Sequence, residues 1–79
     1  MVLYTRSGCH LCEDAEAVLR AAGASRPFRL RVVDIDADPG LAERYGVRVP
    51  VVAVDGVEHF QYEVPPDELL AVLEGAGSA

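Results

Sequence analysis

Strand-like segments alternate with helix-like segments along this chain, and this alternation limits the folds open to it. Short β-branched or alternating apolar runs predict strands at 2–5, 28–35, 47–54 and 57–62. Apolar residues at helical spacing predict a helix over 11–22, a helix of barely two turns over 39–45, and a last helix around 69–73. Gly23, Gly46 and Gly75 are the expected helix ends. The predicted order is βαβαββα.

The connections between these segments predict the sheet. We expect strands separated by a helix to lie parallel, because crossovers of this length cannot be hairpins. Asp55-Gly56 is the dipeptide that a tight type I′ hairpin favours, so the last two strands should be antiparallel. The predicted fold class is α/β, with a mixed four-stranded sheet and helices on both faces.

The size of the chain allows one core and no second domain. Its 79 residues should form a single domain over 1–79, with an ordered core at about 2–74 and a frayed tail at 76–79. No apolar run approaches the roughly 20 residues of a membrane-spanning helix, and the first residues lack the pattern of a secretory signal. A net charge of −6 disfavours nucleic acid as a partner. We expect a cytoplasmic monomer that binds neither membranes nor nucleic acid.

The cysteines are only two, Cys9 and Cys12, and they lie where the first strand gives way to the first helix. A helix N-terminus favours negative charge, so a Cys9 thiolate would be stabilised there. The three-residue spacing brings Cys12 to the same side of the first turn, within reach of a disulfide. Because the thiolate is the nucleophile, we expect the exposed Cys9 to attack and the more sheltered Cys12 to resolve the mixed disulfide.

Charged neighbours support this difference between the two cysteines. Arg6 and a protonated His10 would add positive potential near Cys9, whereas Glu13 and Asp14 would resist a second thiolate at Cys12. The alternative interpretation is that Arg6 is a solvated loop residue and that His10 is a surface residue of the helix, without a role at Cys9.

The step Val49-Pro50 interrupts an otherwise β-prone run of valines. Proline cannot donate to a sheet ladder, so the run must break locally or begin there as a strand. A cis bond would explain the break and would leave the Val49 backbone free to pair with an extended substrate. A trans proline at the first residue of the strand is the alternative.

A different class of function would use the cysteine pair without redox chemistry. Cys9 and Cys12 could form half of a non-catalytic metal or iron–sulfur site, but zinc normally takes four ligands and the other histidine, His59, falls on the predicted edge strand. Such a site would require a dimer that shares it. The redox interpretation requires no cofactor and no metal.

Four segments give the chain a family resemblance: LYT at 3–5, GCHLC at 8–12, VDID at 33–36 and YGVRVPVV at 45–52. With the element order, they resemble glutaredoxin and thioredoxin-type proteins, above all the small bacterial glutaredoxin-like proteins, over about 2–74. The resemblance implies a thioredoxin fold and a thiol–disulfide oxidoreductase or electron carrier. In it Cys9 is the nucleophile, Cys12 the resolving thiol and Pro50 a cis proline facing them.

The resemblance also implies the substrates, which are protein disulfides or a low-molecular-weight thiol. The residues assigned to substrate binding are Arg6, His10, Leu11, Val49 and Pro50. His10-Leu11 stands where glutaredoxins usually have proline and tyrosine. The segment HFQYEVPPDEL, at 59–69, lacks the Gly-Gly pair of glutathione-binding glutaredoxins. Binding of glutathione therefore stays open.

Overall fold

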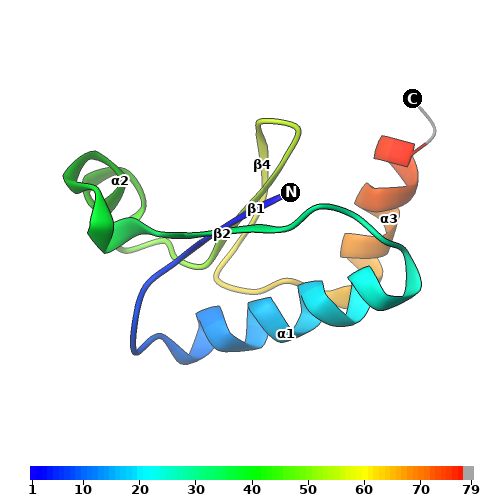
Figure 1. Ribbon diagram of the computed structural model, residues 1–79, viewed down its shortest axis with the longest axis horizontal. Coiled ribbons are helices and arrows are strands. Elements are labelled where there is room, and N and C mark those ends of the chain that lie inside the picture. Colours follow the sequence, from blue (N-terminus) through cyan, green and yellow to red (C-terminus); the bar gives the residue numbers. More distant parts are fainter. Residues whose placement is uncertain (78–79) are drawn as a thin grey trace.

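The computed structural model describes residues 1–77, with a four-stranded sheet, three α-helices and one short 3-10 helix in that part of the chain (Figure 1). The elements are β1 (Val2–Thr5), α1 (His10–Ser25), β2 (Arg31–Asp34), η1 (Ile35–Ala37), α2 (Pro39–Tyr45), β3 (Val51–Val54), β4 (Val57–Gln61) and α3 (Pro66–Gly77). The predicted order and the predicted α/β class are both confirmed.

Two local features follow from residue chemistry. Asp38 caps α2, because its carboxylate accepts a hydrogen bond of 2.8 Å from the Gly40 N–H, and Pro39 follows as the first helical residue. Asp55 and Gly56 both have positive φ, 53° and 82°, as a type I′ turn requires. They join β3 to β4 as an antiparallel pair.

The sheet has the strand order β2-β1-β3-β4. β1 pairs parallel with β2, as predicted for strands joined through a helix. All four residues of β3 are buried because this strand lies inside the sheet, between β1 and β4.

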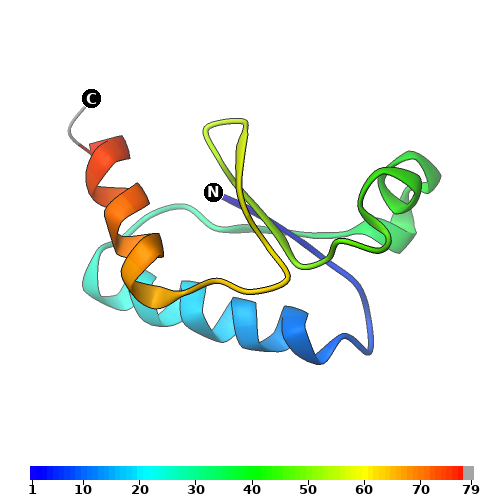
Figure 2. The same ribbon diagram turned by 180° about the vertical axis from the view of Figure 1, so that it is seen from behind.

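One predicted strand direction is wrong. We expected β3 to lie parallel to β2, but β3 runs antiparallel to β1, which is itself parallel to β2. Val33 of β2 and Val51 at the start of β3 both pair with Tyr4, so the chain leaves β2 and enters β3 at the same end of the sheet. A parallel crossover must carry the chain back along the sheet, whereas the seven residues of α2 span only about 10 Å. Figures 1 and 2 show α2 at one end of the molecule, opposite α3.

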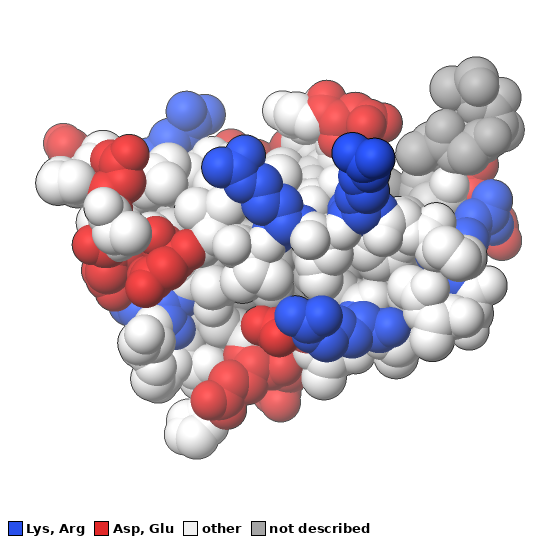
Figure 3. All heavy atoms as spheres, viewed as in Figure 1, with Lys and Arg blue, Asp and Glu red and all other residues white. Residues whose placement is uncertain are grey.

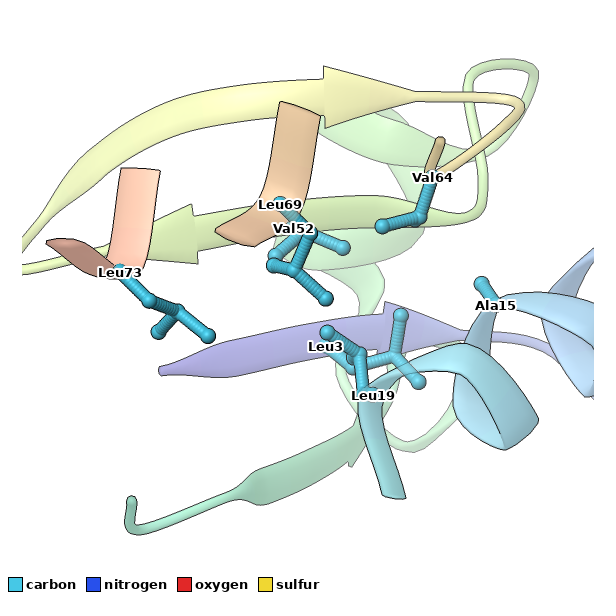
Figure 4. Packing of buried hydrophobic residues seen from close by; sticks show 7 residues of the cluster. All are labelled: Leu3, Ala15, Leu19, Val52, Val64, Leu69 and Leu73. Carbon is cyan, nitrogen blue, oxygen red and sulfur yellow. The ribbon is translucent and has the colours of Figure 1, made fainter. Parts of the chain in front are cut away.

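Two helices cover one face of the sheet. The core on this face consists of Leu3, Ala15, Leu19, Val52, Val64, Leu69 and Leu73. Their side chains come from β1, β3, α1, α3 and the segment before α3, and they converge between the helices and the strands (Figure 4). This packing fixes the long helix α1, and with it Cys9 and Cys12, against the sheet.

The other face has a smaller core around α2. Because neighbouring residues in a strand point to opposite faces, Val51 packs here while Val52 packs on the first face. Ile35 and Tyr45 complete the buried cluster. The Tyr45 ring stacks on that of Tyr4, with ring centroids 4.3 Å apart. Helices therefore lie on both faces of the sheet, as predicted.

Two of the three glycines expected to end helices do not do so. α1 continues past Gly23, which packs against the Phe28 ring, and ends at Ser25. α3 continues through Gly75 to Gly77, because one glycine costs a helix only about 1 kcal/mol. Gly46 does end α2.

The tail at 76–79 was predicted to be frayed. Residues 76–77 belong to α3, and 78–79 lie outside the described residues.

Two strands are shorter than predicted. β2 begins only at Arg31, because β1 is its one neighbour in the sheet and starts at Val2, the partner of Arg31. β3 begins at Val51, directly after Pro50, which has no N–H to donate to a neighbouring strand. Val47, at the start of the predicted strand, is 88% exposed.

In the described part of the chain, no helix combines the length and the apolar character needed to cross a membrane.

Candidate active site

Cys9 is the N-cap of α1. Its backbone is extended, with φ −96° and ψ 110°, and its Sγ accepts a hydrogen bond of 3.1 Å from the Cys12 N–H. The sulfur thus takes the place of the side-chain oxygen that usually caps a helix. Gly8, with φ 77°, turns the chain from β1 into this cap. The Cys9 sulfur therefore lies at the positive end of the helix dipole, with a backbone N–H directed at it.

Cys12 lies one turn further on and is 2% exposed, whereas Cys9 is half-buried. Burial raises the pKa of the Cys12 thiol, and the neighbouring Cys9 sulfur raises it further. Interactions with the Thr5 side chain and the Arg6 backbone oppose this rise in pKa. Cys12 is therefore held as a neutral thiol beside a more accessible sulfur. This difference in exposure agrees with the sequence prediction.

A groove of about 210 Å³ contains both cysteines. Its other lining residues come from the end of β1, the following loop, the first turns of α1 and the end of β2: Thr5, Arg6, Ser7, Gly8, Glu13, Glu16 and Asp34. Thr5 and Asp34 pair with each other as the last residues of the parallel strands β1 and β2. The groove therefore lies where the carboxyl ends of parallel strands meet, a common place for sites in α/β proteins.

Arg6 lines this groove, but its guanidinium is already bonded. It donates to both carboxylate oxygens of Asp36, at 2.9 to 3.2 Å, and to the Gly46 carbonyl at 3.1 Å. The ion pair lowers the pKa of Asp36 and raises that of Arg6. Arg6 thus ties the loop before Cys9 to η1 and to the end of α2, and its charge is compensated.

The two residues between the cysteines face different surroundings. The His10 side chain is 96% exposed, and its nearest charged partner is Glu13, with 3.7 Å between Nδ1 and Oε2. Leu11 is 44% exposed and lines a second groove of about 250 Å³ on the other side of α1. Tyr62 lies across this second groove and is also 44% exposed.

Val49 and Pro50 lie outside both grooves. Val49 packs partly buried against the Ile35, Tyr45 and Val51 cluster, and the Pro50 side chain is fully buried. The peptide bond between Val49 and Pro50 is cis, and the Pro50 carbonyl accepts a hydrogen bond from the Tyr62 N–H. The predicted substrate-binding residues are therefore brought together only in part, with Arg6 beside the cysteines and Leu11 in the neighbouring groove.

Three acidic residues around the cysteines were missed by the sequence prediction. Asp34 closes the groove from β2, Glu16 lies one helical turn beyond Cys12, and Asp36 binds Arg6. A sequence signal existed for the first two: Asp34 ends a strand parallel to the one before Cys9, and Glu16 follows Cys12 at i+4. Within the described residues, no group of three or more potential metal ligands is gathered at one point.

Comparisons with known proteins agree with this arrangement. The chain is 35% identical over 74 residues to uncharacterized proteins of Mycobacterium tuberculosis and Mycobacterium bovis, with 87% of this chain and 76% of theirs covered. An X-ray structure of a protein from X. campestris matches with a TM-score of 0.78 and 34% identity over 94% of this chain and 95% of that one.

A solution structure of a protein from Nitrosomonas europaea matches with a TM-score of 0.74 and 40% identity, over 90% and 86% of the two chains. These likenesses fit the thioredoxin-like fold of the mixed sheet and its helices. The family model described as "Glutaredoxin-like domain (DUF836)" matches residues 1–74. The chain therefore belongs to this glutaredoxin-like domain family within the thioredoxin superfamily.

Proposed function

We propose that the protein is a thiol–disulfide oxidoreductase or electron carrier that cycles Cys9 and Cys12 between dithiol and disulfide. The observation that carries this proposal is the contrast between the two sulfurs. Cys9 caps α1 and accepts a hydrogen bond from the Cys12 N–H, while Cys12 is 2% exposed with a raised pKa. Membership in a glutaredoxin-like family supports a thiol redox role.

The proposed reaction proceeds in two exchanges. The Cys9 thiolate attacks one sulfur of a substrate disulfide, so that a Cys9–substrate bond forms, the substrate S–S bond breaks, and the released thiolate takes up a proton. Cys12 then gives up its proton and attacks the Cys9 sulfur, which releases the second substrate thiol. The substrate gains two electrons, and the protein becomes the Cys9–Cys12 disulfide. A thiol reductant reverses the sequence.

The substrate class within this proposal is a protein disulfide or the disulfide of a low-molecular-weight thiol. Leu11 supports an apolar contact beside Cys9, because it is half exposed at the edge of the second groove. The Val49 backbone remains the proposed contact for an extended substrate, whereas Pro50 is fully buried and its carbonyl already accepts from the Tyr62 N–H. The proposed setting is the bacterial cytoplasm, where thiols are kept reduced and a cysteine pair serves chemistry rather than structure.

A redox titration tests the proposal. The protein is equilibrated in dithiol/disulfide buffers of graded potential, free thiols are labelled with maleimide, and the mass is measured. We expect a single transition in which both thiols are lost together as an intramolecular disulfide. The variants Cys9→Ser and Cys12→Ser should show no such transition. If wild-type protein keeps two free thiols across the whole range of potentials, the proposal is wrong.

A further inference from the structure

Charge around the cysteine groove is strongly unbalanced. Glu13, Glu16 and Asp34 line the groove with Cys9 and Cys12, and Arg6 is the only cation among its lining residues. Figure 3 shows acidic side chains gathered at the end of the molecule where β2 ends and α1 begins.

The nearby cations are already paired with carboxylates. The Arg6 guanidinium is held by Asp36, which lies beside the groove, and Arg20 bonds the Glu16 carboxylate at 2.9 Å. Glu13, 74% exposed, faces only the side chain of His10 among the partners found in the described residues. Asp34 accepts a hydrogen bond of 2.9 Å from the Asp36 N–H, which leaves its negative charge in place. With Arg6 and Arg20 paired to Asp36 and Glu16, the carboxylates of Glu13 and Asp34 exceed the positive charges at the sulfur pair.

The second groove, which Leu11 lines, is also negatively charged. Asp14 and Glu63 line it together with the exposed apolar side chains of Leu11 and Tyr62, and no lysine or arginine is among its lining residues. Both approaches to the start of α1 are therefore acidic. An anionic substrate would be repelled on either side, whereas a cationic one would be attracted.

We propose that Glu13 and Asp34 make the protein selective for disulfides that carry positive charge next to the sulfurs, such as those flanked by ammonium or guanidinium groups. This inference rests on the proposed oxidoreductase function and names its substrate class. The selectivity acts on the first exchange, in which Cys9 attacks the substrate. The two electrons come from the protein's own dithiol, so no further reductant takes part in that turnover.

Single-turnover kinetics test this selectivity with three disulfides of similar size. Prereduced protein is mixed at low ionic strength with cystamine (dication), hydroxyethyl disulfide (neutral) or 3,3′-dithiodipropionate (dianion). Each rate is divided by the rate of 2-mercaptoethanol with the same disulfide, which corrects for their differing intrinsic reactivity. We expect a corrected preference for the dication over the dianion of about tenfold. In 1 M salt, where charges are screened beyond about 3 Å, the preference should nearly vanish.

Isosteric variants assign the effect to the named residues. Glu13→Gln and the double variant Glu13→Gln/Asp34→Asn should lower the preference, the double variant by about threefold or more. The control is Glu74→Gln, which removes one charge near Arg26, past the other end of the roughly 24 Å helix α1, and should leave the preference unchanged. Because Glu13 is exposed, its single variant retains the fold and keeps the test valid if the double variant unfolds.

The possible outcomes separate the two proposals. If the neutral disulfide oxidises the protein but the corrected rates do not depend on substrate charge, the selectivity is refuted and the redox function stands. A preference that persists in the double variant also refutes the selectivity. If none of the three disulfides oxidises the protein, both proposals fail. If the small disulfides show the selectivity, a matched pair of disulfide peptides flanked by lysine or by glutamate tests whether it extends to protein segments.

Discussion

At the scale of single residues, the site depends on how differently two cysteines of one helical turn are surrounded. Cys9 is accessible and accepts an N–H hydrogen bond as the helix cap, whereas Cys12 is buried against the sheet with a raised pKa. Arg6, in the loop before this turn, reaches Asp36 and the Gly46 carbonyl and so anchors the loop. One helix end therefore combines a more accessible sulfur, a buried sulfur and an anchored loop.

The ion pair between Arg6 and Asp36 makes stability depend on pH in a defined direction. The folded-state pKa of Asp36 lies below its ordinary value of 3.8, so the contribution of the pair is fully present above that value and is lost as the pH falls through the folded pKa. Urea unfolding of wild type and Asp36→Asn, from pH 7 to pH 2, measures the contribution as the difference between the two. We expect a difference in favour of wild type that is constant above about pH 5 and shrinks below about pH 4. A difference that stays constant down to pH 2 would contradict the assigned role of Asp36.

The sequence predicts where the two cysteines lie in the fold better than it predicts which residues surround them. A strand followed directly by a helical pattern is enough to place Cys9 at a helix N-terminus, and the structure has it there. The partner of Arg6 is 30 residues away at Asp36, and the groove residue Asp34 comes from another strand. Such contacts depend on the strand register and on the path of η1, which local patterns do not contain.

At the scale of elements, turns and caps decide where the chain changes direction. The hairpin at Asp55-Gly56 and the cap at Asp38 follow from local residue chemistry, and both were predictable. Gly23 and Gly46 look alike in the sequence, yet only Gly46 ends a helix. The difference arises from tertiary packing, because Gly23 lies inside α1 where Phe28 packs against it.

The hairpin between β3 and β4 offers a matched pair of substitutions. Gly56 has φ 82°, and nothing lies within 4 Å of the place of an added Cβ, so Gly56→Ala suffers only from its backbone conformation. We expect a loss of about 1–2 kcal/mol in the free energy of unfolding, measured in urea. The neighbouring Asp55→Asn should stay within about 0.5 kcal/mol of wild type, because asparagine also suits a type I′ turn. Equal effects of the two substitutions would argue against this turn.

At the scale of the whole molecule, the sheet divides the protein into two cores of unequal size. The larger core, between the sheet and the helices α1 and α3, holds the helix that carries both cysteines. The smaller core, under α2, lies at the end of the sheet where the chain leaves β2 and enters β3. The sequence predicted both layers but not the direction of β3, because a short helical segment does not reveal whether it crosses the sheet or turns back at one end.

Adjacent leucines of α3 test the larger core. Leu69 is fully buried in it, whereas Leu70 is 39% exposed. We expect Leu69→Ala to lower the free energy of unfolding by about 3 kcal/mol, a large share of the stability of so small a domain. Leu70→Ala should cost less than about 1 kcal/mol. The two values come from urea unfolding monitored by circular dichroism, and a reversed order would contradict the packing of α3.

In the proposed function, Cys9 attacks a disulfide and Cys12 resolves the product. The most direct measurement is trapping: reduced Cys12→Ser protein is mixed with hydroxyethyl disulfide, and its mass is followed over time. We expect a stable mixed disulfide on Cys9, a transient or absent adduct in wild type, and almost no adduct in Cys9→Ser, where the remaining thiol is buried. An adduct that forms as fast on Cys9→Ser, or none on Cys12→Ser, would contradict the claim.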